Sequence, residues 1–254
     1  MLPLSVAIIA CNEADRVGDA IRSVEFADEV VVLDSGSSDD TVQTCEGLGA
    51  RVLRTDWPGH VAQKNRALRA VTHDWVLCID ADERVGPDLA REIAAFRARP
   101  RSGVVGLSVP RLSWWMGAPI RHGTWHPDRR VRMVDRRHAA WAGSDPHDRL
   151  EVDGPVLGCS AALLHHPYRD LGEHLDTIDR YTRIAAEAAA LRGVRARPWD
   201  LLLRPPAHLL KALVFKGGLL DGPRGLAVAW LGAVYVQLKW LRIWQRNRGA
   251  AEAP

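Results

Sequence analysis

A mostly apolar run, Trp75 to Ile79, leads directly into the acidic sequence Asp80-Ala81-Asp82-Glu83. A strand with apolar side chains on both faces is typical of a parallel sheet that is covered on each side. The carboxylates that follow repel one another unless positive charge lies among them. A divalent cation meets that need, because Mg²⁺ commonly takes one or two protein carboxylates together with substrate phosphates. The alternative is a solvated acidic turn after a core strand.

Further apolar runs alternate with segments of helical periodicity. Strands are predicted at residues 4–10, 29–33, 50–53 and 75–79, and helices at 14–24, 61–70, 87–96 and after an N-cap at Ser38. This alternation indicates βαβ units and a parallel sheet, in which ligands bind beyond the carboxyl ends of the strands. Asn12 and Glu13 follow the first strand, and Asp34 follows the second. We therefore expect these side chains to converge with Asp80 and Asp82 at one edge.

The pattern changes past residue 103, where a loop-rich segment carries Trp114, Trp115, Trp125 and Trp141. Aromatic side chains among Gly, His and Arg suit a carbohydrate or lipid-headgroup site; the alternative is that they fill a small core. Strands are predicted at residues 104–109 and 156–164, and an alanine-rich helix at residues 175–191.

The C-terminal segment is strongly basic. Residues 204–249 contain eight Lys or Arg and one acid, Asp221, a local charge of +7 in a chain of net charge +3. That asymmetry favours an anionic partner, either a membrane surface or a nucleic acid. The uncharged stretch 225–238 is followed by Trp and Arg residues, which is typical of a helix lying at a membrane interface. The alternative is a helical pair packed against the domain.

The location follows from several simpler features. No stretch of about 18 uncharged apolar residues occurs, so a membrane-spanning helix is not expected. The four cysteines have no C-x-x-C spacing, which fits a reducing cytosol, and the N-terminus does not resemble a signal peptide. We expect a cytoplasmic protein, peripherally associated with the inner face of the cytoplasmic membrane, with no nucleic-acid partner.

Common nucleotide-binding and hydrolase motifs are missing. Neither G-x-G-x-x-G nor G-x-x-x-x-G-K-[ST] occurs, which disfavours dinucleotide dehydrogenases and P-loop NTPases. No G-x-S-x-G elbow is present either. A parallel sheet with acids at its strand ends and a D-x-D sequence remains. That combination suits a metal-bound diphosphate whose nucleotide lies over the early strands.

Four segments carry a recognisable set of motifs: S-V-A-I-I-A-C-N-E from Ser5, A-D-E-V-V-V-L-D-S-G-S-S-D from Ala27, Q-K-N from Gln63 and D-W-V-L-C-I-D-A-D-E from Asp74. In this order and at these intervals they resemble the family 2 glycosyltransferases, most closely the lipopolysaccharide core glucosyltransferase subgroup. Three later pieces are similar to that subgroup as well: R-H-G-T-W-H-P-D from Arg121, His147-Asp148, and L-L-D-G from Leu219. The resemblance covers most of the chain.

The resemblance implies an α/β fold, the GT-A (nucleotide-diphospho-sugar transferase) fold. Its mostly parallel central sheet would be flanked by helices, with a C-terminal helical extension that associates with the membrane. Residues 1–200 would form the catalytic domain, with a nucleotide-binding half at 1–100 and an acceptor half at 101–200. Residues 201–254 would form the basic, apolar helical extension.

The resemblance also implies the residues of a nucleotide-sugar site. Asp34 would contact the uracil or ribose, while Asn12 and Glu13 would shape the nucleotide pocket. Cys11 would belong to the same pocket, at a position where many relatives have a polar or aromatic residue. Lys64 would lie near the base or the phosphates.

Mg²⁺ or Mn²⁺ is the implied cofactor, with Asp82 as the direct metal ligand. Asp80 would contact the ribose or the metal. His165 would be a further contact to the metal or diphosphate, and the alternative for it is a local hydrogen bond. The metal would offset charge on the departing diphosphate, a Lewis-acid role.

An inverting transfer also needs a base that takes the proton from the acceptor hydroxyl. The subgroup usually has His-Glu where this chain has His147-Asp148, so Asp148 is the predicted base. Asp145 and Asp153 are competitors. The alternative for Asp148 is a structural ion pair with Arg149.

Together these features predict an inverting, metal-dependent glycosyltransferase that moves a sugar from a UDP-sugar to a membrane glycolipid, with the lipopolysaccharide inner core as the expected acceptor. Transfer to polyprenyl phosphate is an alternative. A Mg²⁺-dependent phosphatase with Asp80 as nucleophile and Asp82 as acid is another. Against it, the motif follows the fourth predicted strand, and Arg84 stands where Thr or Val is expected. A catalytically silent membrane-bound scaffold is the third.

Overall fold

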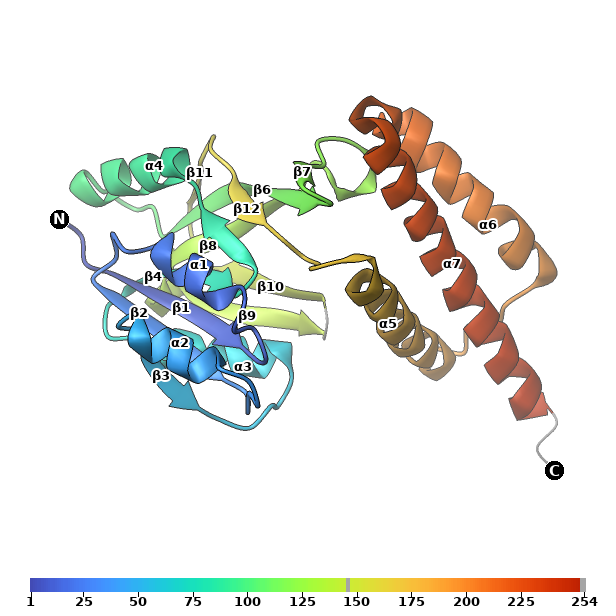
Figure 1. Cartoon of the computed structure of the whole chain (residues 1–254), viewed down its shortest axis with the longest axis horizontal. Helices are drawn as coiled ribbons and strands as arrows, with labels where there is room; N and C mark the ends of the chain where they lie inside the picture. The colour runs from blue at the N-terminus through green and yellow to red at the C-terminus, as the bar shows by residue number, and fades with distance from the viewer. Residues whose placement is uncertain (145–146, 252–254) are drawn as a thin grey trace. The chain divides into compact units, whose positions relative to one another are not determined.

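The structure, a computed structural model, describes residues 1–144 and 147–251 of the chain (Figure 1). The chain divides into two compact units. The first contains Met1–Leu112 and Asp128–His165, and the second contains Ser113–Pro127 and His166–Pro254. The predicted separation into residues 1–200 and 201–254 stays a prediction about domains.

The first unit is built on four parallel strands in the spatial order β3-β2-β1-β4. They are β1 (Leu4–Ala10), β2 (Glu29–Asp34), β3 (Arg51–Arg54) and β4 (Trp75–Asp80). The predicted strands and their parallel pairing are confirmed. Because strand order reverses beside β1, the carboxyl ends of β1, β2 and β4 meet at one edge of the sheet.

Helices connect these strands: α1 (Val17–Arg22), α2 (Thr41–Gly47), α3 (His60–Ala70) and α4 (Pro87–Ala98). Pro at the first position of α4 agrees with the prediction. The predicted N-cap at Ser38 is wrong, since α2 begins at Thr41 with Asp40 at the N-cap position. The side chain of Asp39 accepts a hydrogen bond from the Thr41 amide at 3.0 Å, so an acid satisfies the first turn in place of Ser38.

Antiparallel strands extend the sheet beyond β4, so the sheet is mixed. They are β8 (Arg129–Asp135), which pairs with β4, then β6 (Gly106–Trp115), β12 (Leu163–His165) and β5 (Glu83–Val85). A further strand, β11 (Val156–Gly158), pairs with β6 in parallel.

The single strand predicted at residues 156–164 is wrong, because the structure has β11 and β12 there, separated by residues 159–162. The amides of Ser160 and Ala161 donate to the carboxylate of Glu92 on α4 at 2.9 Å. These bonds satisfy the backbone outside any strand ladder, between β11, which pairs with β6, and β12, which lies between β6 and β5.

The core explains why β4 is apolar throughout. Leu77 and Ile79 pack into one buried cluster together with side chains of α1 and α4. Val76 and Cys78 pack into a second cluster with side chains of α3 and with Trp141. Trp141 belongs to the antiparallel hairpin of β9 (Ala139–Ser144) and β10 (His147–Val152). Both faces of the strand are therefore covered, as the sequence predicted.

The second unit is helical, with α5 (Leu171–Leu191), α6 (Pro198–Leu210) and α7 (Gly222–Ala251). The helix predicted at residues 175–191 is confirmed and begins four residues earlier, where Asp170 accepts a hydrogen bond from the Glu173 amide. Trp115 and Trp125 pack with apolar side chains of α5 and α7, so these two tryptophans belong to a small core.

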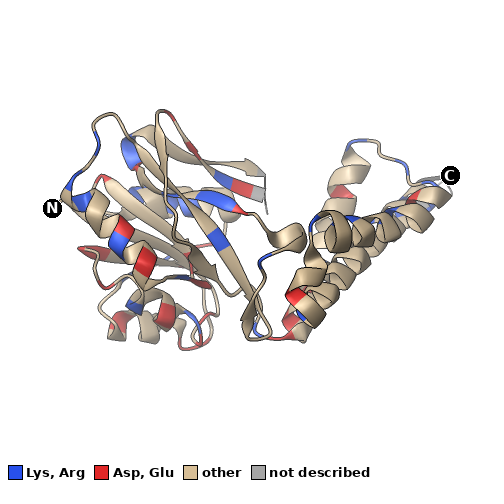
Figure 2. Ribbon diagram, turned by 90° about the horizontal axis from the view of Figure 1, so that it is seen from above, with Lys and Arg blue, Asp and Glu red and all other residues tan. Residues whose placement is uncertain are grey.

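The uncharged stretch 225–238 lies within the 30-residue helix α7. By length and composition alone, Gly218–Arg248 is long and apolar enough to cross a membrane, with 28% of its most apolar window buried. The expectation that no helix has this capacity is therefore not supported. Figure 2 marks the charged residues along these helices.

Candidate active site

The strand register brings the predicted acids together. Asp34 at the end of β2 lies opposite Ala10 at the end of β1, and Asp80 at the end of β4 lies opposite Ile9. β1 lies between the other two strands, so the polar residues after each of them share one edge of the sheet. The predicted convergence is confirmed at the level of the backbone.

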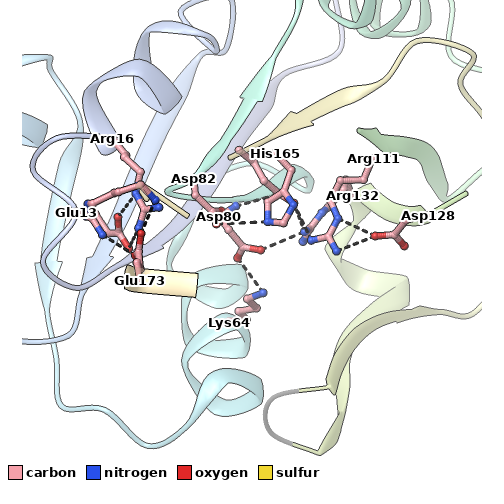
Figure 3. A network of polar contacts seen from close by, with 12 residues as sticks. Glu13, Arg16, Lys64, Asp80, Asp82, Arg111, Asp128, Arg132, His165 and Glu173 are labelled. Atoms are coloured by element: carbon pink, nitrogen blue, oxygen red, sulfur yellow. Dashed lines mark hydrogen bonds and ion pairs between the residues drawn. The ribbon is translucent and has the colours of Figure 1, made fainter. Parts of the chain in front are cut away.

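Positive side chains lie among the carboxylates of the D-x-D sequence (Figure 3). Asp80 Oδ1 is 2.8 Å from Lys64 Nζ, and Asp80 Oδ2 is 3.1 Å from Arg132 Nη2. Burial opposes the charge of this carboxyl, but the ammonium and the guanidinium hold the pKa of Asp80 well below its usual range. Asp80 is therefore a carboxylate at any pH near neutrality, and Arg132 was not among the predicted site residues.

Glu83 supports the loop rather than facing a ligand. Its side chain is fully buried, and its Oε2 accepts a hydrogen bond from the Asp80 amide at 3.0 Å. Its Oε1 accepts hydrogen bonds from Arg132 and, at 3.4 Å, from Arg111. Arg111 in turn binds Asp128 at 2.7 Å. This buried network fixes the backbone that presents Asp80 and Asp82.

Asp82 has the features of a metal ligand. Its Oδ1 is buried and has no hydrogen-bond partner among the residues that the structure describes, while its Oδ2 lies 3.4 Å from His165 Nε2. Burial raises the pKa of the Asp82 carboxyl, and the neighbouring His165 lowers it. The lowering effect is the larger, so the pKa of Asp82 lies below its usual value. An unpartnered carboxylate oxygen in a buried position is costly unless a cation binds it.

These residues fit a divalent cation that is completed by its substrate. No group of three or more His, Cys, Asp or Glu that could hold a metal occurs among the described residues. Mg²⁺ is commonly bound by one or two carboxylates, with waters and substrate phosphates as the other ligands. Asp82, with Asp80 beside it, supplies that number of carboxylates.

Lys64 joins the D-x-D sequence to the predicted base. Its nearly buried ammonium lies 2.8 Å from Asp148 Oδ2 as well as 2.8 Å from Asp80, and 4.5 Å from the centre of the Trp141 ring. Burial works against this charge, but Asp80 and Asp148 raise the pKa of Lys64 above its usual value. The ammonium therefore stays charged and bridges two acids on β4 and β10.

The pairing on β10 separates the candidate bases. Arg149 points to the other side of the strand and pairs with Glu151, so its predicted alternative pairing with Asp148 is wrong. Asp153 is exposed beyond the end of β10. Asp145 lies outside the described residues. Among the described candidates, Asp148 is the acid held next to Asp80.

The Q-K-N motif serves three separate purposes. Buried Gln63 donates to the hydroxyl of Ser35 at 3.0 Å, which fastens the loop after β2 to α3. Asn65 exchanges two hydrogen bonds with the backbone of Trp141, at 2.8 and 3.0 Å. Lys64, between them on the helix, is thereby held against the β9–β10 hairpin.

Asp34 organises the loop on the nucleotide side. Its buried carboxylate accepts hydrogen bonds from the amides of Gly36 and Ser37, each at 3.1 Å, and from the Ser37 hydroxyl. Gly36 has a φ of +87°, which favours glycine. The predicted contact of Asp34 with the uracil or ribose stays a prediction.

The loop after β1 is bound to the same structure. Asn12, with a φ of +57°, donates its amide to Ser37 Oγ at 2.9 Å and accepts from the Ser38 amide at 2.8 Å. The Glu13 amide donates to Thr41 Oγ1, and its carboxylate pairs with Arg16 at 2.7 Å.

Cys11 lies exposed next to these residues. Partial burial and the nearby Asp34 and Glu13 raise the pKa of its thiol, which stays neutral. Cys11, Asn12, Glu13 and Asp34 thus lie at the two connected loops after β1 and β2, while Lys64 lies on α3 and Asp80 ends β4. The contacts of all six residues with a ligand stay predictions.

Comparison with known proteins decides the family. The model for "Glycosyl transferase family 2" matches residues 5–137. The chain is 31% identical over 254 residues to the lipopolysaccharide core biosynthesis glycosyltransferase LpsC of Rhizobium meliloti, covering 97% of this chain and 93% of that protein. The chain belongs to glycosyl transferase family 2. An uncharacterized glycosyltransferase of Rickettsia prowazekii is 46% identical over 85% of this chain and 78% of its own length.

The structural comparison agrees with the fold of this glycosyltransferase. The mannosyltransferase PcManGT from Pyrobaculum calidifontis, in complex with GDP-Man and Mn²⁺, matches with a TM-score of 0.54. The match has 16% identity and covers 97% of this chain and 88% of that one. The GT-A fold is therefore confirmed. Family membership also contradicts the phosphatase and silent-scaffold alternatives.

Sequence reasoning missed several residues of this candidate site. Arg132 and Arg111 come from β8 and β6, which are far along the chain from the D-x-D sequence. Their signal in the sequence is weak: each is a basic residue in an otherwise strand-like segment. Trp141 was predicted only as one of four tryptophans. Its ring, beside Lys64, covers the second face of β4.

Proposed function

We propose that this glycosyltransferase transfers a sugar, with inversion, from a UDP-sugar to a membrane glycolipid of the lipopolysaccharide core type. The observation that carries this proposal is the bridge from Asp80 through Lys64 to Asp148, beside the unpartnered oxygen of Asp82. The bridge supports a site in which Asp80 and Asp82 face the metal and the donor diphosphate, and Asp148, linked to them through Lys64, faces the acceptor hydroxyl.

Asp148 is the proposed general base. Its carboxylate accepts the proton of the acceptor hydroxyl as that oxygen bonds to the anomeric carbon and the bond to the diphosphate breaks. Lys64 remains paired with Asp80 when Asp148 becomes neutral, so the three side chains change from a net charge of −1 to a neutral set. Attack from the side opposite the leaving group inverts the anomeric configuration.

The proposed metal site uses Asp82 with Asp80 beside it, and His165 orients Asp82 through the 3.4 Å contact. A bound Mg²⁺ or Mn²⁺ would offset the negative charge on the departing diphosphate. Cys11, Asn12, Glu13 and Asp34 form the proposed nucleotide pocket, which the sequence resemblance supports. The acceptor class is supported by the relative named as a lipopolysaccharide core glycosyltransferase. A cytoplasmic enzyme at the inner membrane face would have access to both substrates.

The direct test is a thermal-shift and calorimetry panel of UDP- and GDP-sugars with and without Mn²⁺. We expect Mn²⁺-dependent binding of a UDP-sugar that Asp82→Asn weakens by at least about 10- to 100-fold, since loss of a residue that only supports a metal ligand already costs that much. Asp88→Asn, at an exposed acid on α4, is the matched control. Unchanged Mn²⁺-dependent binding by Asp82→Asn would falsify the metal assignment. Transfer assays with core glycolipid and with polyprenyl phosphate decide the acceptor.

A further inference from the structure

The second unit turns large apolar side chains outward over one segment. Half of the exposed large apolar side chains in the described chain fall between Trp199 and Trp230: Trp199, Leu202, Leu203, Leu210, Val214, Phe215, Leu219, Leu220, Leu226 and Trp230. Such a concentration marks an interaction surface, since exposed apolar residues are ordinarily scattered.

The two most exposed of these residues, Phe215 at 77% and Leu220 at 74%, lie where α6 gives way to α7. We name them, together with Leu210, Val214 and Leu219, the apolar apex. The chain turns there through a π-helical segment, η3 (Lys211–Phe215), and a 3₁₀ turn, η4 (Gly218–Asp221).

The apex is tightly built. A Cβ on Gly218 would approach the Ala212 carbonyl oxygen to 2.6 Å, and one on Gly225 would approach the Gly218 carbonyl oxygen to 1.9 Å. The backbones can meet this closely only because both positions are glycine. The exposed apolar side chains therefore project from an ordered turn.

The exposed charged side chains around the apex are basic, and the acids of the segment are turned inward. Lys211, Lys216 and Arg224 are exposed. Of the two acids in the segment, Asp200 is 6% exposed and binds Arg204, and the side chain of Asp221 is 8% exposed and pairs with His122. An apolar surface with a basic border suits an anionic lipid leaflet. A second copy of the chain would bring like charges together.

Contacts of α7 argue against its crossing the membrane. Arg242 binds the carboxylate and carbonyl of Asp179 and the Thr182 hydroxyl on α5, and Ile243 is fully buried. The guanidinium of Arg204 on α6 lies 4.2 Å from the centre of the Trp240 ring. A spanning α7 would lose these contacts.

The apex is also bonded to the tryptophan-rich loop 113–127 of the same unit. The Gly123 amide donates to the Lys216 carbonyl at 2.8 Å, and the His122 amide donates to Asp221 at 2.8 Å. Arg224 donates to the carbonyl of Met116, whose side chain is itself exposed. Wherever the apex lies, this loop lies beside it.

We propose that the apolar apex inserts into an anionic lipid leaflet as a monotopic anchor. Insertion holds the loop 113–127 at the headgroup level, where a glycolipid presents its sugars. This second step rests on the proposed function, because it takes the acceptor to be a membrane glycolipid.

The test is flotation of the full chain, without nucleotide or metal, with vesicles of phosphatidylcholine alone or mixed with phosphatidylglycerol. We expect binding to the mixed vesicles, and a loss of at least ~10-fold for the double variant Phe215→Ser/Leu220→Ser. Leu191→Ser is the matched control, since this leucine is 86% exposed but ends α5. Lys211→Gln/Lys216→Gln should weaken binding by about five-fold or more on mixed vesicles only.

Three outcomes would overturn the proposal. The first is unchanged vesicle binding by the apex double variant. The second is resistance of the bound protein to extraction with alkaline carbonate, which would indicate that α7 spans the membrane. The third is a dimer of the parent protein, measured by light scattering, that the double variant loses. Transfer assays separate this proposal from the proposed function. The double variant should glycosylate a delipidated core oligosaccharide as the parent protein does, and be slow only on glycolipid in vesicles. If the parent protein is inactive on both acceptors, the proposed function is contradicted. The vesicle-binding experiment then still tests the membrane anchor by itself.

Discussion

The parallel sheet in the first unit has acids at both edges, and Glu29 at the amino edge is bound differently from Asp80, Asp82 and Asp148 at the carboxyl edge. At the amino edge, Glu29 accepts hydrogen bonds from Ser5, from the amide and hydroxyl of Thr72, and from Arg51. At the carboxyl edge, Asp80 and Asp148 share one ammonium, and Asp82 keeps a buried oxygen without a partner among the described residues.

The difference separates stabilising acids from acids available for chemistry. A carboxylate surrounded by donors from its own chain lowers the energy of the folded state and has little capacity left for a ligand. A carboxylate that shares a cation, or lacks a donor, leaves that capacity to a metal, a diphosphate or a substrate proton. Substitutions at the two edges should therefore affect different measurements.

The largest effect is expected at the carboxyl edge. Asp148→Asn keeps the shape of the side chain but removes its basicity, so we expect turnover to fall by about 10²- to 10⁴-fold with UDP-sugar affinity retained. Steady-state kinetics and calorimetry on the same preparations measure both quantities. Asp153→Asn, beyond the end of the same strand, should behave as the parent protein. Near-normal turnover by Asp148→Asn would remove it as the base.

An intermediate effect is expected at the amino edge. Glu29→Gln presents an amide nitrogen to at least one of the donors that now bind the carboxylate, and we expect the free energy of unfolding to fall by about 1–3 kcal/mol. Turnover per folded molecule should not change, because the residue lies at the edge away from the site. Urea denaturation and kinetics check this together, with Glu151→Gln at an exposed ion pair as the control. A loss of turnover without a loss of stability would break the distinction between the edges.

The sequence predicts the sheet and most of the carboxyl edge because both depend on local features. β1 and β4 are continuous apolar runs, and the polar residue after each run identifies the strand end. Arg132 could not be predicted, because it reaches Asp80 only through the antiparallel pairing of β8 with β4, where Met133 lies opposite Leu77. Antiparallel partners that are distant in sequence leave no periodic signal.

The same limit applies to the roles of individual acids. The helix that carries Lys64 is held by a hydrogen bond from the Asn65 side chain to the Trp141 carbonyl, a contact between residues 76 positions apart. Between the two strands of residues 156–164, the Ser160 amide likewise binds Glu92, which lies on a separate helix 68 positions away. Residue types and spacing identified the candidates, while the tertiary contacts decided which of them are held together.

The smallest effect is a pH dependence that belongs to the amino edge. Burial opposes the charge of Glu29, but the donors Ser5, Thr72 and Arg51 lower the pKa of its carboxyl to about 2 from the usual 4.5. A carboxyl whose pKa is lower in the folded state stabilises the fold fully when the pH is above its pKa in the unfolded state. That contribution is lost as the pH falls toward its pKa in the folded state. The stability gap between the parent protein and Glu29→Gln should therefore shrink by about 1–2 kcal/mol from pH 5 to pH 2.5. Urea midpoints of both proteins across that range measure it. A gap that stays constant would mean that Glu29 acts through its shape and not its charge, and the amino edge would then lose its distinction as the site of stabilising carboxylates.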